Sequence, residues 1–172
     1  MASLPEALNF QSFRPVKTIW RIVTARFADS AFTGEGARLF GGRWNRKGLP
    51  MVYTAEARSL ALLELMVQDD PLRAHYLLIP AFVPSDVSLR ELEAAELGGD
   101  WRALSARDRL QTRGNDWLQG GESCILSVPS AVVPAERNFL INPLHPDFSK
   151  ISIGEAESLE TDVRLLRALG GA

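Results

Sequence analysis

Short strand-like and helix-like segments follow one another along this chain without a regular rhythm, and this pattern limits its fold most. Runs of β-branched and aromatic residues predict strands at 18–24, 51–54, 75–83, 123–133 and 138–142. Apolar spacing predicts helices at 54–68, 89–97 and 106–118, with helical character again at 164–169. A doubly wound parallel sheet needs strands and helices in steady alternation, so the sequence predicts an α+β fold instead. It contains neither G-x-G-x-x-G after a strand nor G-x-x-x-x-G-K-[ST], which argues against a dinucleotide-binding fold or a P-loop.

Length and composition are those of an ordinary soluble protein. The 172 residues predict a single domain over 1–172, in which 1–17 form an irregular N-terminal arm. A net charge of -2 gives no reason to expect a surface that binds nucleic acid. Cys124, the single cysteine, and two histidines leave a zinc site almost without ligands. We expect a cytoplasmic protein without a signal peptide. We expect no membrane span either, since no apolar run approaches the roughly 18 residues that a span needs.

Three local signals set further expectations. Thr54 is a candidate N-cap for the helix that follows it. Pro80, within the strand at 75–83, favours an edge strand or a bulge because it lacks an amide proton. The charge cluster Arg107-Asp108-Arg109 is expected on a solvated helix face.

A glutamate stands alone in an otherwise apolar helix candidate. Glu64 is the only charged residue in 59–67. With Ala57, Leu60 and Ala61 it follows i, i+3, i+4, i+7 spacing, which places its carboxylate on the apolar face of the helix. Burial of a carboxylate is costly unless it is paired or hydrogen-bonded. Glu64 therefore either forms a structural salt bridge with a core arginine or faces a cleft as a catalytic acid.

Two arginines and a tyrosine are further candidates for a site. In the segment 41–45 (GGRWN), two glycines allow close approach of the backbone to a ligand, and Arg43 offers a planar fork that suits phosphate oxygens. Trp44 can pack beneath that arginine; the alternative is a tight turn with a surface arginine. Arg21 lies inside an apolar strand and points either to solvent or to a partner. Tyr53 ends a short strand just before the glutamate helix and is otherwise a core aromatic.

Ser130 lies in an apolar stretch bracketed by Pro129 and Pro134, without a G-x-S-x-G elbow around it. The two histidines, His75 and His145, belong to no recognisable triad signature. The sequence therefore argues against a hydrolase nucleophile and favours a serine that orients a substrate through hydrogen bonds.

Taken together, these segments resemble the RES domain, the toxin of RES–Xre type toxin–antitoxin systems. The matching stretches occur in the family's order at 34–38 (GEGAR), 41–45 (GGRWN), 52–53 (VY), 61–64 (ALLE), 128–134 (VPSAVVP) and 138–143 (NFLINP). One such piece would be weak, whereas several in order with compatible spacing are specific.

The resemblance implies a fold and a set of site residues. The fold is an ADP-ribosyltransferase-like mixture of short strands in small sheets with peripheral helices. Arg43, Glu64 and Ser130 match the arginine, glutamate and serine of the family name and are its expected catalytic residues, although Ser127 competes with Ser130 for the serine position. Arg21 and Tyr53 match positions that line the substrate pocket.

The resemblance also implies an activity and partners. The expected activity is cleavage of the nicotinamide–ribose bond of NAD, with water, phosphate or a protein side chain as acceptor. NAD is then a substrate, and no cofactor or metal is required. The expected partner is a helix-turn-helix antitoxin of the Xre type, with no membrane and no nucleic acid bound directly by this chain.

The chemistry of the residues agrees with this activity. Arg21 and Arg43 can clamp a pyrophosphate, Glu64 can hold a ribose hydroxyl and offset developing positive charge, and Tyr53 can stack on nicotinamide. The alternative is a non-catalytic module that binds a protein or a nucleotide, in which Glu64 forms a structural ion pair. A toxin ribonuclease is disfavoured, because the chain lacks a basic surface and a histidine pair.

Overall fold

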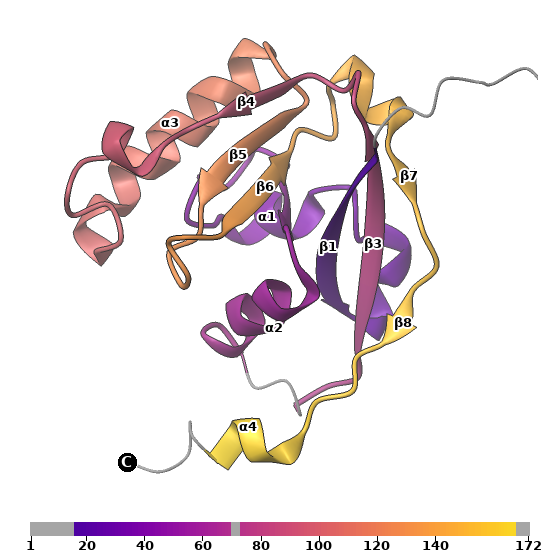
Figure 1. Ribbon diagram of the computed structural model, residues 1–172. Helices are drawn as coiled ribbons and strands as arrows, with labels where there is room; N and C mark the ends of the chain where they lie inside the picture. Colours follow the sequence, from indigo (N-terminus) through magenta and orange to yellow (C-terminus); the bar gives the residue numbers. More distant parts are fainter. Residues whose placement is uncertain (1–15, 70–72, 168–172) are drawn as a thin grey trace, which may run out of the picture.

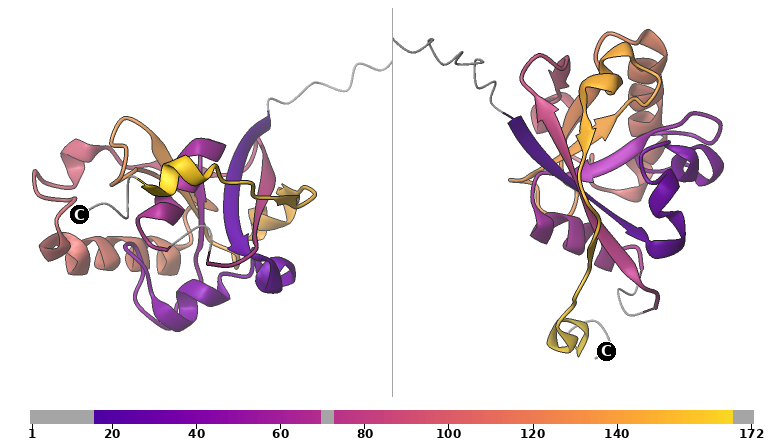
Figure 2. Two further views of the ribbon diagram at one scale, coloured as in Figure 1. Left: turned by 90° about the horizontal axis from the view of Figure 1, so that it is seen from below. Right: turned by 90° about the vertical axis from the view of Figure 1, so that its right-hand side faces the viewer.

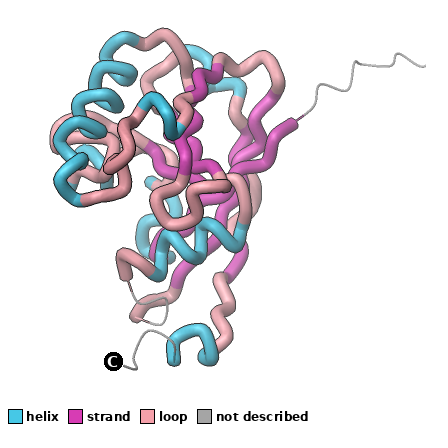
Figure 3. The backbone as a smooth tube through the Cα atoms, turned by 60° about the vertical axis from the view of Figure 1, so that its left-hand side comes forward, coloured by secondary structure: helices cyan, strands magenta, loops and turns pink. Residues whose placement is uncertain are grey.

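The computed structural model describes residues 16–69 and 73–167 of the chain (Figure 1). The strands in these ranges are β1 (Val16–Thr24), β2 (Val52–Ala55), β3 (Tyr76–Pro84), β4 (Leu89–Glu91), β5 (Ile125–Pro129), β6 (Arg137–Ile141), β7 (Ser152–Ile153) and β8 (Glu157–Ser158). The α-helices are α1 (Glu35–Phe40), α2 (Arg58–Met66), α3 (Arg107–Gly120) and α4 (Val163–Arg167). Short 3-10 helices occupy Ala25–Ser30, Ala94–Glu96, Leu104–Ala106 and Pro146–Lys150. Figure 3 shows the helices around the periphery of the strands, so the predicted α+β class is confirmed.

The strands form one curled sheet that opens in its middle. Their order is β4-β5-β6-β2-β1-β3-β7, with β8 also paired to β3. β1 and β3 are aligned over their whole length, from Val16 opposite Pro84 to Thr24 opposite Tyr76. β1 and β2 share a single aligned pair, Trp20 with Ala55. The β1–β3 half and the β2–β6–β5 half therefore diverge, as Figures 1 and 2 show.

Alternation along the strands divides the apolar side chains between the two faces of the sheet. One face carries a cluster that joins both halves and includes Ile19, Val52, Ile79, Ile125 and Phe139. On the other face, the neighbouring residues form two separate clusters. One, with Leu126 and Leu140, packs against α3, and the other, with Trp20 and Leu78, packs against α2. This face is thus covered at two places rather than continuously.

Helix α2 presents the face that its spacing predicts. Leu60 is fully buried and Ala61 is 7% exposed, and both pack against Ala55 and Leu78 of the sheet. Glu64 lies one turn further along the same face and is partly buried. The helix itself begins at Arg58 and ends at Met66, inside the predicted range of 54–68.

Several local expectations were wrong. Thr54 does not cap α2, because it lies in β2 and its hydroxyl donates to the carbonyl of Phe139. Pro80 is not on an edge strand: β3 lies inside the sheet, and Pro80 occupies the gap between the short strands β7 and β8.

The predicted boundaries also need correction in three places. Residues 89–97 form a short strand and a 3-10 turn rather than one helix. Strand β5 ends at Pro129, so Ser130 follows the strand instead of lying in it. The predicted irregular arm, 1–17, lies outside the described residues except for its last two, which already belong to β1. Helix α1 was not predicted as a helix at all.

None of the helices in the described ranges is long and apolar enough to cross a membrane.

Candidate active site

A cavity of about 560 Å³ lies where β1 and β2 diverge. Its walls come from β1, β2 and β6, from α1 and α2, and from the segment 41–44 and the start of α3. Four of the five predicted site residues line it: Arg21, Arg43, Tyr53 and Glu64. The structure therefore brings together side chains that are up to 43 positions apart in the sequence (from Arg21 to Glu64).

The carboxylate of Glu64 is held by neutral donors at one of its two oxygens. Oε1 accepts a hydrogen bond of 2.5 Å from Asn138 Nδ2 and one of 2.8 Å from Ser130 Oγ. Among the described residues, Oε2 has no hydrogen-bond partner, and no cationic side chain pairs with Glu64. The structural ion pair that the sequence left open is therefore not formed.

Ser130 acts behind Glu64 rather than in the cavity. It is fully buried and does not line the cavity. Its hydroxyl donates to Glu64 and accepts from the backbone amides of Val132 and Val133, each at 3.0 Å. All the hydrogen-bonding capacity of this hydroxyl is used inside the protein. The sequence predicts a catalytic serine here, and the observed contacts are those by which a serine positions a neighbouring carboxylate.

Ser127, the competing serine, faces a different partner. Its hydroxyl accepts a hydrogen bond of 2.6 Å from Arg137 Nε. The same arginine donates to the carbonyls of Leu92 and Ser127 and pairs with Glu93. The geometry thus separates the two serines, because only Ser130 contacts the glutamate.

Arg21 is a partly buried cation without an anionic partner among the described residues. Its Nη1 donates to the backbone carbonyl of Tyr53 at 2.8 Å, and its Nε is buried without a hydrogen bond. Burial lowers the pKa of Arg21 to about 10, so the group remains charged near neutral pH. An unpaired, partly buried guanidinium in the wall of a cavity favours an anionic ligand.

The GGRWN segment is built around Asn45 and Tyr53. Asn45 is fully buried, and its Nδ2 lies within hydrogen-bond distance of the carbonyls of Ala37, Arg46 and Leu49. The Tyr53 hydroxyl donates to Asn45 Oδ1 at 2.7 Å and accepts from the amide of Trp44 at 3.0 Å. These bonds fix the loop next to the cavity.

Two glycines allow this loop to pack. A Cβ at Gly42 would lie 2.4 Å from the Tyr53 hydroxyl, and a Cβ at Gly114 would lie 1.8 Å from the carbonyl oxygen of Trp44. Gly42 therefore permits contact with the tyrosine, and Gly114 permits the close approach of α3. The expected role of Gly42, close backbone approach, is present, although the neighbour is a protein side chain.

Trp44 and Arg43 both line the cavity but differ in burial. Trp44 is 3% exposed and belongs to the cluster beneath α3. Arg43 lines the cavity, and its one recorded hydrogen bond is a long one, 3.4 Å from Nη1 to the carbonyl of Arg102. The guanidinium is thus available to a ligand.

Two lining residues were missed by the sequence analysis. The sequence analysis gave Asn138 no role in the site beyond its place in a strand and in the NFLINP match. In the structure it anchors Glu64 and lines the cavity. Arg107 was expected on a solvated face, but it also lines the cavity. The NFLINP stretch was a signal for the asparagine, whereas nothing in the sequence distinguished Arg107 from its charged neighbours. No group of three potential metal ligands occurs in the part of the chain that the structure describes.

Comparisons with known proteins decide the family. A family model described as the RES domain matches residues 18–162. This chain belongs to the RES-domain family. A protein named Toxin Res from Photorhabdus laumondii subsp. laumondii is 35% identical over 153 residues, covering 87% of this chain and 97% of that protein. A Sphingobium protein named Prs ADP-ribosylating toxin is 37% identical over 157 residues, with 87% and 97% covered.

The fold of this RES domain is also found in a solved structure. A chain of the M. tuberculosis MbcT-MbcA toxin-antitoxin complex matches with a TM-score of 0.71 and 20% identity, covering 92% of this chain and 91% of that one. The likeness extends to the fold, and it agrees with the mixed α+β class that the sequence predicted. In this RES domain, the three residues of the family name are arranged with Glu64 in the middle: Ser130 holds it from behind, and Arg43 lies on the wall of the same cavity.

Proposed function

We propose that this RES domain is the toxin of a toxin–antitoxin pair and that it consumes NAD by breaking the nicotinamide–ribose bond. The observation that carries the proposal is the state of Glu64: one oxygen is anchored by neutral donors, and the other is free in a cavity lined by unpaired arginines. A relative at 37% identity is named an ADP-ribosylating toxin, which supports the use of NAD. A purely structural glutamate would have its charge paired.

In the proposed complex, Arg21 and Arg43 bind the pyrophosphate oxygens of NAD, because both arginines line the cavity without an anionic partner among the described residues. The ribose that carries nicotinamide lies against Glu64, whose free Oε2 accepts a hydrogen bond from a ribose hydroxyl. Tyr53 lines the cavity next to Gly42, and stacking of its ring on nicotinamide stays a prediction.

The bond between the ribose anomeric carbon and the nicotinamide nitrogen breaks first. Its electron pair moves to the nitrogen, which thereby loses its positive charge, and the ribose carbon takes on oxocarbenium character. The negative charge of Glu64 stabilises that carbon, and Ser130 and Asn138 keep the carboxylate in place. An incoming oxygen or nitrogen nucleophile then forms the new bond and loses its proton to solvent. Water, phosphate or a protein side chain can act as this nucleophile.

The direct test is to incubate the purified chain with NAD, with and without phosphate, and to identify the products by mass spectrometry. We expect free nicotinamide together with ADP-ribose, its phosphorylated form or a modified protein. If NAD is neither consumed nor transferred to any target under these conditions, the enzyme proposal is wrong, and the alternative of a non-catalytic binding module takes its place.

The partner of this toxin is proposed to be a helix-turn-helix antitoxin of the Xre type, and the cytoplasm, which holds NAD, is the proposed place of action. A chain of the MbcT-MbcA toxin-antitoxin complex has the same fold, which supports an antitoxin. Expression of the chain alone should arrest growth and deplete NAD, and co-expression of the neighbouring reading frame should restore both. If the neighbouring frame has no effect, this partner is wrong, although the NAD activity can still hold.

A further inference from the structure

Most arginines away from the cavity form ion pairs, whereas the arginines that line it do not. Away from the cavity, arginine side chains form ion pairs in eight places: Arg38–Glu35, Arg46–Asp108, Arg58–Glu157, Arg73–Asp69, Arg90–Glu122, Arg109–Asp100, Arg137–Glu93 and Arg164–Asp162. At the cavity, Arg21, Arg43 and Arg107 have no carboxylate partner among the described residues. Among the described residues, Arg26, Arg102 and Arg113 also lack a carboxylate partner. The three cavity arginines are distinguished because they line the same cavity in a chain whose net charge is -2.

The contrast is sharpest within the charge cluster at the start of α3. Asp108 pairs with Arg46, and Arg109 pairs with Asp100 at 2.8 Å and donates to the carbonyl of Leu97. Arg107, the first residue of the helix, lines the cavity and has no recorded hydrogen bond in the described ranges. Within one helical turn, Asp108 and Arg109 thus bind other protein side chains, whereas Arg107 faces the cavity.

Tyr53 shows how the three cations are distributed along the cavity. Arg21 donates to the backbone carbonyl of this tyrosine. At the other end of the side chain, burial raises the pKa of the hydroxyl, and the positive charges of Arg107 and Arg43 act in the opposite direction. Gly42 and Trp44, on either side of Arg43, both lie against this hydroxyl. Gln111, one turn after Arg107 on α3, donates to the carbonyl of Gly42. Arg43 and Arg107 are therefore on the hydroxyl side of Tyr53, whereas Arg21 contacts its backbone.

Glu64 lies towards the Arg21 end of this line. Trp20, the neighbour of Arg21, is opposite Ala55 in the sheet, and Ala55 is opposite Asn138, whose amide holds Glu64. In this arrangement a ribose at Glu64 lies on the side of the strands that carry Arg21 and its partner carbonyl, and the other two arginines lie on the side of the GGRWN loop and α3.

From this arrangement we propose that Arg107 and Arg43 form a second phosphate subsite, which binds the phosphate on the adenosine side of a dinucleotide. The phosphate next to the nicotinamide ribose is bound by Arg21. The inference rests on the proposed NAD activity and deepens it: Arg107 makes this RES domain selective for a dinucleotide over nicotinamide mononucleotide, which has a single phosphate.

The experiment compares Arg107→Ala with Arg109→Ala, a matched control two residues away whose guanidinium is paired outside the cavity. With NAD, we expect Arg107→Ala to raise KM by about tenfold, the effect of one charge-assisted hydrogen bond, with kcat changed less than about twofold. With nicotinamide mononucleotide, KM should be unchanged, so the preference for NAD falls by the same factor. Arg109→Ala should leave both values as in the wild type.

A binding measurement separates this inference from the proposed function. Inorganic pyrophosphate, titrated into the wild-type chain by calorimetry, should bind about tenfold more weakly to Arg107→Ala and equally well to Arg109→Ala. If the two variants behave alike in kinetics and in pyrophosphate binding, Arg107 is an ordinary surface residue and the second subsite is wrong. If NAD is not cleaved but pyrophosphate binding depends on Arg107, the proposed reaction fails and the anion site remains.

Discussion

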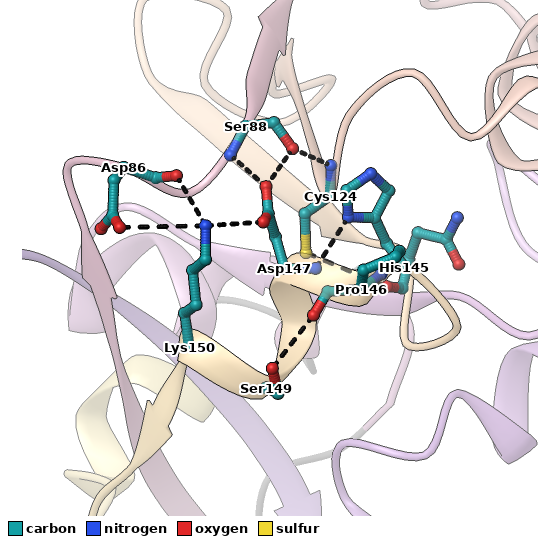
Figure 4. A network of polar contacts seen from close by, with 9 residues as sticks. Asp86, Ser88, Cys124, His145, Pro146, Asp147, Ser149 and Lys150 are labelled. Carbon is teal, nitrogen blue, oxygen red and sulfur yellow. Dashed lines mark hydrogen bonds and ion pairs between the residues drawn. The ribbon is translucent and has the colours of Figure 1, made fainter.

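Glu64 and Asp147 are both carboxylates with several hydrogen bonds, but the protein holds them in different ways. Asp147 Oδ2 accepts from the Ser88 amide at 3.0 Å and from its hydroxyl at 2.7 Å, and Oδ1 lies 2.7 Å from Lys150 Nζ (Figure 4). Both oxygens are engaged and the charge is neutralised. The pKa of Asp147 lies well below its usual range, because Lys150 and Ser88 donate hydrogen bonds to the ionised form.

Asp147 connects segments that are far apart in the chain. The Ser88 hydroxyl that donates to it also accepts from the amide of Cys124, just before β5, and Lys150 also lies near Asp86. Burial raises the pKa of the Cys124 thiol to about 12, so this cysteine is neutral and unreactive within the network. A saturated, charge-paired carboxylate of this kind stabilises the fold.

Glu64 contrasts with this at each point. Its donors are neutral, they meet at one oxygen, and the other oxygen faces a cavity. The charge is therefore not offset within the protein and can act on positive charge that develops in a ligand. Hydrogen bonds from neutral groups thus fix the position of a carboxylate without neutralising its charge.

The largest expected effect comes from Glu64→Gln. Because a glutamine oxygen can still accept from Ser130 and Asn138, the variant should fold and melt within about 2 °C of the wild type. Without the negative charge, kcat/KM for NAD should fall about a thousandfold. Steady-state NAD kinetics and thermal unfolding of the same preparation check both statements. A variant that retains activity but loses many degrees in Tm would make Glu64 a structural residue like Asp147.

Arg21→Met should have the next largest effect. Loss of the unpaired cation should raise KM for NAD by about 10- to 100-fold, since hydrogen bonds from a charged group are lost. Because this partly buried charge has no anionic partner among the described residues, its removal should not lower Tm, even though the carbonyl of Tyr53 loses a hydrogen-bond donor. A fall of several degrees, without any change in KM, would instead indicate that Arg21 is satisfied within the folded protein.

The serines sharpen the same comparison on a smaller scale. Ser130→Ala removes one of the two donors to Glu64, so kcat for NAD should fall about tenfold. Ser127→Ala leaves Arg137 Nε without its partner, which should lower Tm but leave kcat unchanged. Equal kcat values for the two variants would show that the contact between Ser130 and Glu64 does not position the carboxylate for the reaction.

Some residues of this site could be predicted from local sequence pattern, and others needed the family resemblance. The apolar face of α2 was readable from its spacing, because a helix buries residues of one stripe, and Glu64 interrupted that stripe. The two glycines of GGRWN predicted close approach of the backbone, and Gly42 makes such an approach to the side chain of Tyr53. The local sequence made Arg43 and Ser130 candidates, and the family resemblance gave them their expected catalytic roles.

Other features could not be read from local pattern. Ser130 was expected in the substrate pocket, but whether a side chain lies in front of a carboxylate or behind it is decided by the turn after β5. Arg107 looked like Asp108 and Arg109, and only the packing of α3 on the loop at Trp44 brings it to the cavity. Thr54 had the side chain of a helix cap, yet the strand pairing of β2 with β6 placed its hydroxyl against a carbonyl.

The smallest expected effect is that of Asp147→Asn, and it concerns stability alone. Since Asp147 is far from the cavity lining, NAD turnover should be unchanged, while Tm at pH 7 should fall by about 2–4 °C because the Lys150 pair is lost. The folded-state pKa of Asp147 is depressed relative to the unfolded value of about 3.9, so its contribution is present above that pH and is lost as pH falls through the folded-state pKa. The difference in Tm between wild type and variant should therefore be constant from about pH 5 to 7 and shrink below about pH 4. A difference that persists undiminished in acid would mean that the charge of Asp147 plays no part, and that its hydrogen bonds position it in the same neutral manner as those of Glu64.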